Sequence, residues 1–180
     1  METGLTPESI TLNPDPGYIN YLSQFDFYEF AFEGLQLLSD NGHRFCIITN
    51  QSGISRGIVD VDKLSEIHDY ILNSFHKNKL DLLGIYYCPD HPDKASNNRK
   101  PGSGMFLEAS QDHNIETSKC LMIGDALSDI QAGVNLGMDT MLLLSGKGLQ
   151  TSEKLGTLRP TFIAEDLLDG AKLLLEQPSS

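Results

Sequence analysis

Three polar segments of the sequence each follow an apolar run and carry side chains whose types can do chemistry. Thr49 and Asn50, at the end of one such run, can bind phosphate oxygens through a hydroxyl and a backbone N–H. The segments are residues 49–57 (TNQSGISRG), residues 88–92 (CPDHP) with residues 99–102 (RKPG) shortly after them, and residues 124–129 (GDALSD). Their chemistry depends on whether the fold brings them to one place.

The apolar runs before these segments read as strands of a parallel sheet. They alternate with helical patterns and lack a polar–apolar alternation, as strands buried on both faces do. The runs are His43–Thr49, Leu83–Tyr87, Cys120–Gly124, Thr140–Leu144 and Thr161–Ala164. In an open α/β sheet, ligands bind outside the carboxyl ends of the strands, so the three polar segments should converge on one crevice.

Helices are expected between the strands, from apolar residues repeating at helical spacing. The expected helices are one around Ala31–Leu38 that ends before Gly42, one over Leu64–Phe75 with Asp62 capping or charging its start, and others over Met105–His113, Ser128–Leu136 and Glu165–Leu174. The first twelve residues, METGLTPESITL, fit this scheme poorly. Only Ile10–Leu12 is apolar enough for the strand that should open the domain.

Composition narrows the class of protein. The 180 residues are 39% hydrophobic and 21% charged, which indicates a globular chain rather than a disordered one. A formal charge of −12 argues against binding to nucleic acid or an anionic membrane, and no apolar run approaches ~18 residues. Three scattered cysteines are too few for a disulfide framework. We expect a soluble, monomeric, cytoplasmic protein.

The polar segments together resemble the haloacid dehalogenase-like (HAD) phosphatase superfamily, and within it the D-glycero-D-manno-heptose 1,7-bisphosphate phosphatases and their histidinol-phosphatase relatives. The resemblance runs from about Thr11 to Lys147 and rests on ITLNPDPGYIN, TNQSGISRG, IYYCP, RKP and GDALSDIQAG. It implies a Rossmann-like, three-layer α/β sandwich with a mainly parallel sheet. We expect one such domain over residues 1–180, with a degenerate first strand or tail at 1–12 and a tail at 177–180.

The resemblance also implies roles for individual residues. Thr49 and Lys100 match catalytic positions, where the lysine neutralises the phosphoryl group, and Asp125 matches the acidic ligand of Mg²⁺. Residues matching substrate contacts are Asp15, Gly17, Tyr18, Asn50, Gln51, Ser52, Arg56 and Arg99. Asp129 either supports the site from behind or favours a helix N-terminus. The implied activity is removal of phosphate from a sugar bisphosphate.

The nucleophile motif of this superfamily is altered. The family pattern is Asp-x-Asp-Gly-Thr-(Leu/Ile)-Asn, whose first Asp attacks phosphorus and whose second protonates the leaving oxygen. Aligned without a gap on Thr11-Leu12-Asn13, these positions hold Pro7 and Ser9. Proline has no side-chain nucleophile, and serine replaces a carboxylate that should neighbour the metal. We therefore expect hydrolysis to be lost or strongly impaired, and Mg²⁺ binding at Asp125 to be weak or lost.

A second departure concerns zinc. Heptose bisphosphatases of this type carry Cys-x-His and later Cys-x-Cys, which form a four-ligand structural zinc site. The corresponding positions here are Cys88, Asp90, Ser96 and Asn98. One thiolate among four positions does not hold zinc tightly, so no zinc site is expected.

Three hypotheses about function follow from these observations. The chain is a working sugar-bisphosphate phosphatase, a pseudophosphatase that binds a phosphosugar or a protein without turnover, or a damaged or alternative product. The altered N-terminus fits natural divergence or a frameshift, altered start or alternative exon, and the sequence leaves both open.

Overall fold

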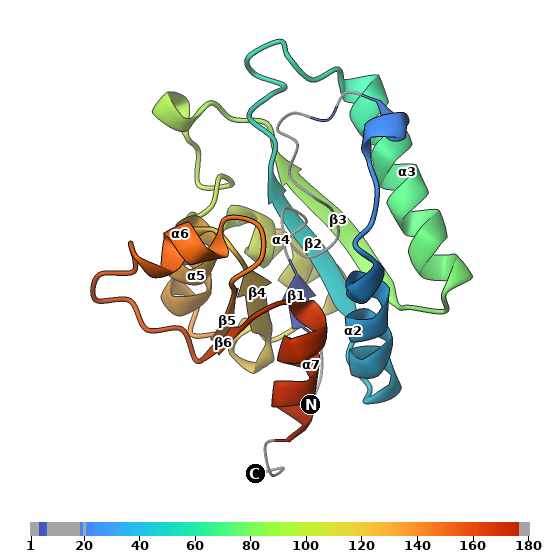
Figure 1. Cartoon of the computed structure of the whole chain (residues 1–180). Helices are drawn as coiled ribbons and strands as arrows, with labels where there is room; N and C mark the ends of the chain where they lie inside the picture. Colours follow the sequence, from blue (N-terminus) through green and yellow to red (C-terminus); the bar gives the residue numbers. More distant parts are fainter. Residues whose placement is uncertain (1–3, 7–18, 20, 177–180) are drawn as a thin grey trace.

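Six parallel strands form one sheet in the order β3-β2-β1-β4-β5-β6 (Figure 1). The computed structural model describes residues 4–6, 19 and 21–176. The strands are β1 (Gly4–Thr6), β2 (Phe45–Asn50), β3 (Leu82–Cys88), β4 (Leu121–Gly124), β5 (Asp139–Leu143) and β6 (Phe162–Ala164). The strand order changes direction around β1, which places the loops after β2 and β4 on either side of it. The expected parallel α/β class is confirmed.

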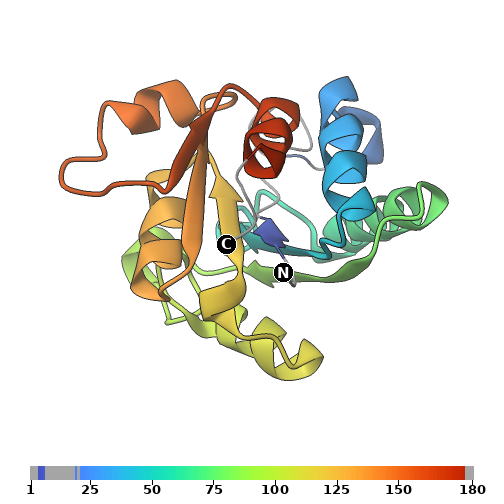
Figure 2. The same ribbon diagram turned by 90° about the horizontal axis from the view of Figure 1, so that it is seen from below.

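Helices cover both faces of the sheet (Figure 2). On one face lie α2 (Glu29–Asp40), α3 (Val61–Lys77) and α7 (Leu167–Leu175), and on the other lie α4 (Gly104–His113) and α5 (Leu127–Asn135). Shorter elements are α6 (Gly148–Ser152) and the 3-10 turns η1 (Leu22–Gln24), η2 (Pro92–Lys94) and η3 (Thr117–Lys119). The sequence pattern did not indicate α6. Among the described residues, no helix combines the length and apolar character needed to span a membrane.

Strand β2 shows why the apolar runs lack alternation. Phe45 and Ile47 point into the core beneath α2, α3 and α7, whereas Cys46 and Ile48 point into the core beneath α4 and α5. Both faces of the strand are therefore buried, as expected for a central parallel strand. All three cysteines are buried, and none forms a disulfide.

The helix termini follow local rules of capping. Asp60 caps α3, since its Oδ1 accepts hydrogen bonds from the backbone N–H of Asp62 at 2.8 Å and of Lys63 at 3.3 Å. Asp62, expected to cap or charge this end, lies in the first turn and supplies charge only. Gly42 follows α2 with φ +84°, a left-handed conformation that favours glycine after a helix.

The first strand differs from the sequence expectation. In the sequence only Ile10–Leu12 was apolar enough for the opening strand, but β1 is Gly4–Thr6, and Ile10–Leu12 lies outside the described residues. β1 closes the centre of the sheet, pairing residues 4–6 with Phe45–Ile47 of β2 and Leu5 with Met122 of β4. β1 pairs with its neighbours through backbone N–H and C=O groups, which do not depend on the side chains. Three apolar residues are therefore not required for this strand.

The helices α2 and α7 pack against each other above β1, where the views of Figures 1 and 2 agree. A Cβ on Gly34 of α2 would lie 2.9 Å from the backbone carbonyl of Leu167 in α7. Glycine at this position therefore allows the two helix backbones to approach closely. This contact joins the β2–β3 half of the molecule to the half formed by β4, β5 and β6.

We predict that His68 makes the fold sensitive to acid. This residue of α3 lies with its ring 5.5 Å from that of Tyr87, and burial lowers the pKa of His68 from 6.5 to about 4, against an opposing effect of Asp69. Because the unfolded chain binds the proton more readily, the stability that His68 contributes is present above pH 6.5 and is lost as the pH falls toward 4.

The measurement is the urea midpoint at pH 7 and pH 5 for the unmodified chain, His68→Gln and His76→Gln. His76 is exposed on the same helix and serves as the matched control. His68→Gln should reduce the loss of stability between the two pH values, and His76→Gln should not. Equal losses in all three proteins would contradict the prediction.

Candidate functional site

The residues expected to form the site lie at the carboxyl edge of the sheet. Thr49 is the penultimate residue of β2, and Asp125 follows β4 directly. Lys100 lies in the loop between β3 and α4. All three are buried, with 2%, 1% and 4% of their surfaces exposed, respectively. The parallel sheet places these strand ends together around the end of β1.

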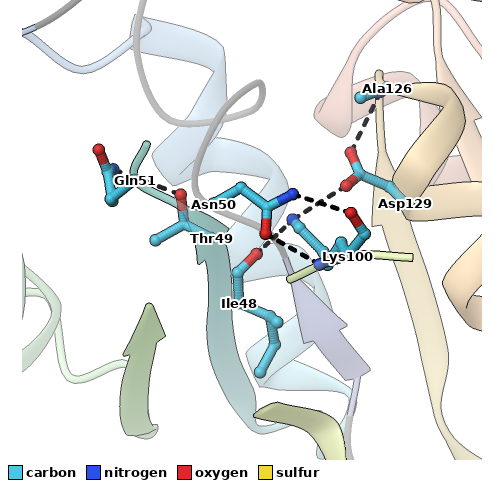
Figure 3. A network of polar contacts seen from close by, with 7 residues as sticks. All are labelled: Ile48, Thr49, Asn50, Gln51, Lys100, Ala126 and Asp129. Carbon is cyan, nitrogen blue, oxygen red and sulfur yellow. Dashed lines mark hydrogen bonds and ion pairs between the residues drawn. The ribbon is translucent and has the colours of Figure 1, made fainter. Parts of the chain in front are cut away.

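The ammonium group of Lys100 lies at the centre of this edge (Figure 3). Its Nζ is 2.9 Å from Oδ1 of Asp129 and also donates a hydrogen bond to the backbone oxygen of Ile48 in β2. Asp129 accepts a second hydrogen bond, from the backbone N–H of Ala126 at 3.1 Å. Both alternatives that the sequence left open for Asp129 are therefore present, since Asp129 pairs with the site lysine and caps the N-terminus of α5.

The side chain of Asn50 holds the backbone of Lys100 at two points (Figure 3). Its Oδ1 accepts the Lys100 N–H at 2.9 Å, and its Nδ2 donates to the Lys100 carbonyl at 3.1 Å. The amide thereby fixes the lysine's main chain against the end of β2. The side chain of Asn50 makes this positioning contact, and the expected contact of Asn50 with substrate stays a prediction.

Asp125 is held through one oxygen only. Its Oδ2 accepts the backbone N–H of Lys147 at 2.7 Å, whereas its buried Oδ1 has no hydrogen-bond partner in the described part of the chain. Burial, assisted by the nearby Asp129 carboxylate, raises the pKa of Asp125 to about 7, although the Lys147 N–H opposes this shift. An orphaned buried carboxylate oxygen is costly unless another group binds it.

The Mg²⁺ implied by the resemblance fits this oxygen. Mg²⁺ in phosphoryl-transfer sites commonly takes one or two carboxylates and fills its remaining positions with water and phosphate oxygens. Asp125 Oδ1 is a suitable ligand of this kind. Within the described ranges, no group of three or more His, Cys, Asp or Glu side chains could hold a metal by itself. A metal at Asp125 would therefore depend on oxygen ligands from elsewhere, including a phosphate.

The remaining candidate residues lie around this centre or outside it. The Thr49 hydroxyl accepts a hydrogen bond from Gln51 Nε2 at 3.3 Å, and Ser52 is half-buried in the turn that follows. Arg56 is exposed on the same loop, and its guanidinium makes no hydrogen bond or ion pair to the described residues. The expected substrate contacts Asp15, Gly17 and Tyr18, together with Pro7 and Ser9, lie outside the described residues.

One contributor to the site was missed in the sequence. The loop after β5 supplies the Lys147 N–H that holds Asp125, and a Cβ on Gly148 would lie 1.7 Å from the carbonyl oxygen of Leu143. Only glycine permits so close a turn back over the strand. The signal available was the segment Ser145–Gly148 (SGKG), a glycine-containing turn after a predicted strand at the same edge of the sheet.

The family implied a zinc site in the loop after β3, and the side chains there do not suit zinc. Asp90 Oδ2 accepts the backbone N–H of Ser96 at 2.7 Å, and Ser96 Oγ accepts the N–H of Asn98 at 3.1 Å. Cys88 is the one sulfur ligand among these four positions, whereas a structural zinc site usually takes four Cys or His ligands. Asp90, Ser96 and Asn98 are linked by hydrogen bonds to one another.

The sheet order, the helices on both faces and the buried lysine–aspartate pair at the carboxyl edge define a HAD-like α/β protein. The HAD-hydrolase-like family matches residues 97–170. Among solved structures of this fold, a D,D-heptose 1,7-bisphosphate phosphatase from B. bronchiseptica, complexed with magnesium and phosphate, has a TM-score of 0.88 at 24% identity. That alignment covers 99% of this chain and 100% of the bacterial one.

Sequence relatives narrow the family. The D-glycero-beta-D-manno-heptose-1,7-bisphosphate 7-phosphatase of Photorhabdus laumondii is 36% identical over 149 residues, 78% of this chain and 79% of the relative. The enzyme of the same name from Haemophilus ducreyi is 36% identical over 169 residues, covering 88% and 90%. The chain belongs to the D-glycero-D-manno-heptose-1,7-bisphosphate 7-phosphatase family of the HAD superfamily.

We predict that Lys100→Met destabilises the fold by about 3 kcal/mol, because it leaves the buried Asp129 carboxylate without its cation. The double variant Lys100→Met/Asp129→Asn should recover part of this loss, since no uncompensated charge remains. The measurement is the free energy of unfolding in urea. Lys94→Met, at an exposed position of the same loop, is the control and should change stability by ~0.5 kcal/mol or less. A single variant as stable as this control would contradict the prediction.

Proposed function

We propose that this chain binds the phosphate group of a phosphorylated sugar at the carboxyl edge of β2 and β4, with hydrolysis strongly impaired. The observation that carries the proposal is the end of β1. This strand stops at Thr6, between the strands that carry Thr49 and Asp125, and the next residue in the sequence is Pro7. The family places its nucleophilic aspartate at the position that Pro7 occupies in an ungapped alignment.

Phosphate binding is supported by the cations and donors at this edge. A lysine ammonium has three N–H donors, and Lys100 uses two of them on Ile48 and Asp129, which leaves one that no described residue accepts and that a phosphate oxygen can take. Arg99 precedes it in the same loop, and the exposed guanidinium of Arg56 has no competing partner in the described chain. Mg²⁺ held by Asp125 Oδ1 would neutralise phosphate charge when bound. Such groups orient and neutralise an anion without forming a bond to it.

Impaired turnover is supported by the carboxylates that remain. Covalent phosphoryl transfer in this family forms a bond between an aspartate oxygen and phosphorus. Asp129 is bound to Lys100 and the Ala126 N–H, and Asp125 is bound to the Lys147 N–H and supplies the candidate metal ligand. Neither is free to attack. Without a nucleophile, hydrolysis requires direct attack by water.

The family relatives define the substrate class to be tested. Their names specify phosphatases of D-glycero-D-manno-heptose 1,7-bisphosphate, so this sugar is the first ligand to try. The competing hypothesis is that the chain is a working phosphatase. Unlike the proposal of binding without efficient turnover, it requires a carboxylate that can attack phosphorus. Glu8, between the two altered positions, is a carboxylate whose role in such an activity can be tested.

We predict weak binding of inorganic phosphate and a turnover of heptose 1,7-bisphosphate lower than that of an intact family enzyme by roughly 10⁴-fold or more, as expected when a covalent nucleophile is absent. Binding is measured by titration calorimetry, and turnover by phosphate release with Mg²⁺. The restored variant Pro7→Asp/Ser9→Asp/Ile10→Gly should gain activity in the same assay.

The control variants are Asp125→Ala and Glu8→Gln. If the unmodified chain turns over at ordinary enzyme rates and either control abolishes that activity, the impaired-turnover proposal is wrong. Absence of phosphate binding to the folded, unmodified chain would refute the binding half.

A further inference from the structure

The loop between β3 and α4 is organised around Asp90. Both its main chain and its side chain act as acceptors, since Oδ2 takes the Ser96 N–H at 2.7 Å and the backbone oxygen takes Nη1 of Arg99 at 3.0 Å. Asp90 thus contacts the middle of the loop at Ser96 and its end at Arg99.

These contacts continue toward the site. The Arg99 N–H donates to the carbonyl of Ser96 at 3.2 Å, so the segment that Asp90 holds also sets the main chain of Arg99. Lys100 follows, fixed by Asn50 from β2. The loop is therefore attached at one end by Asp90 and at the other by Asn50, and the two cations lie between these attachments.

These residues occupy the positions at which the family resemblance implies a structural zinc site. Asp90 Oδ2 accepts the N–H of Ser96, and Ser96 Oγ accepts the N–H of Asn98. The Asn98 side chain packs against the next turn, because a Cβ on Gly104 would lie 1.9 Å from its Oδ1. Asp90, Ser96 and Asn98 thus hold the loop through hydrogen bonds and packing, beside the buried Cys88.

We propose that Asp90 is a positioning residue that replaces a structural metal, holding the loop so that Arg99 and Lys100 face the bound phosphate. The inference rests on the proposed phosphate binding for its ligand, whereas the metal-free organisation of the loop stands on the contacts of Asp90 alone. Under this proposal the Asp90 carboxylate improves phosphate binding because it positions Arg99 and Lys100, although its negative charge repels the phosphate.

The test compares Asp90→Ala with Asp93→Ala in the full chain, in the presence of EDTA. Both variants remove one negative charge from the same loop, and the Asp93 carboxylate is 86% exposed. Loss of charge alone should tighten binding of inorganic phosphate in both. We expect Asp90→Ala to weaken it about tenfold instead, a magnitude typical of partners that orient a ligand-binding residue. Asp90→Asn, which keeps an acceptor oxygen, should restore binding.

Hydrogen exchange of the Ser96 and Arg99 amides is the second readout, with the Ile47 amide of β2 reporting that the fold is intact. We expect Asp90→Ala to lose protection at both loop amides, and EDTA to leave the unmodified chain protected. The proposal is overturned if EDTA removes that protection, or if Asp90→Ala behaves like Asp93→Ala in both readouts. If the unmodified chain binds no phosphate, the proposed function fails. In that case, unchanged amide protection in Asp90→Ala also overturns the metal-replacing role of Asp90. Loss of amide protection in this variant supports that role.

Discussion

A lysine ammonium in the interior of a protein is tolerated only when anionic or carbonyl oxygens replace the water it has lost. Lys100 meets this requirement through Asp129 and the carbonyl of Ile48. Its partners belong to α5 and β2, while the lysine belongs to the loop before α4. A single buried charge therefore ties together three segments that are distant in the sequence. The geometry of the whole carboxyl edge depends on this pairing, because β2 carries Thr49, the loop carries Arg99, and Asp125 lies just before α5.

An acidic chain that binds an anion needs local cations to overcome its overall charge. The formal charge of −12 produces a repulsive field, and salt screens it over about 10 Å at 0.1 M ionic strength. Contacts with Arg99, Lys100 and backbone N–H groups act at much shorter range. Two of the acidic groups near the edge have partners: Asp129 pairs with Lys100, and Asp90 accepts the N–H of Ser96. Their negative charge is therefore used to fix donors in place.

The sequence was informative wherever a feature depended on burial or on strand ends, and uninformative where a side chain meets the backbone of a remote segment. The run around Phe45–Asn50 was recognisable because both faces of β2 are buried, and the position of Thr49 followed from it. The attachment of Asn50 to the main chain of Lys100 spans fifty residues and leaves no periodic signal. The position of β1 was not found in the sequence for a related reason. A three-residue strand in the centre of the sheet is determined by backbone pairing with β2 and β4, which leaves no pattern in its own side chains.

The position of β1 has a consequence for how the chain is made. Residues 4–6 leave the ribosome before the strands with which they pair, and Leu5 pairs with Met122 of β4, which is synthesised more than a hundred residues later. β1 can pair with β2 once that segment emerges, but its other edge stays unpaired until β4 has been synthesised. Contacts between such distant residues form slowly because a long loop has to close. During synthesis the β2–β3 half thus presents an open strand edge, and arrival of β4 is the event that ends its exposure to pairing with other chains.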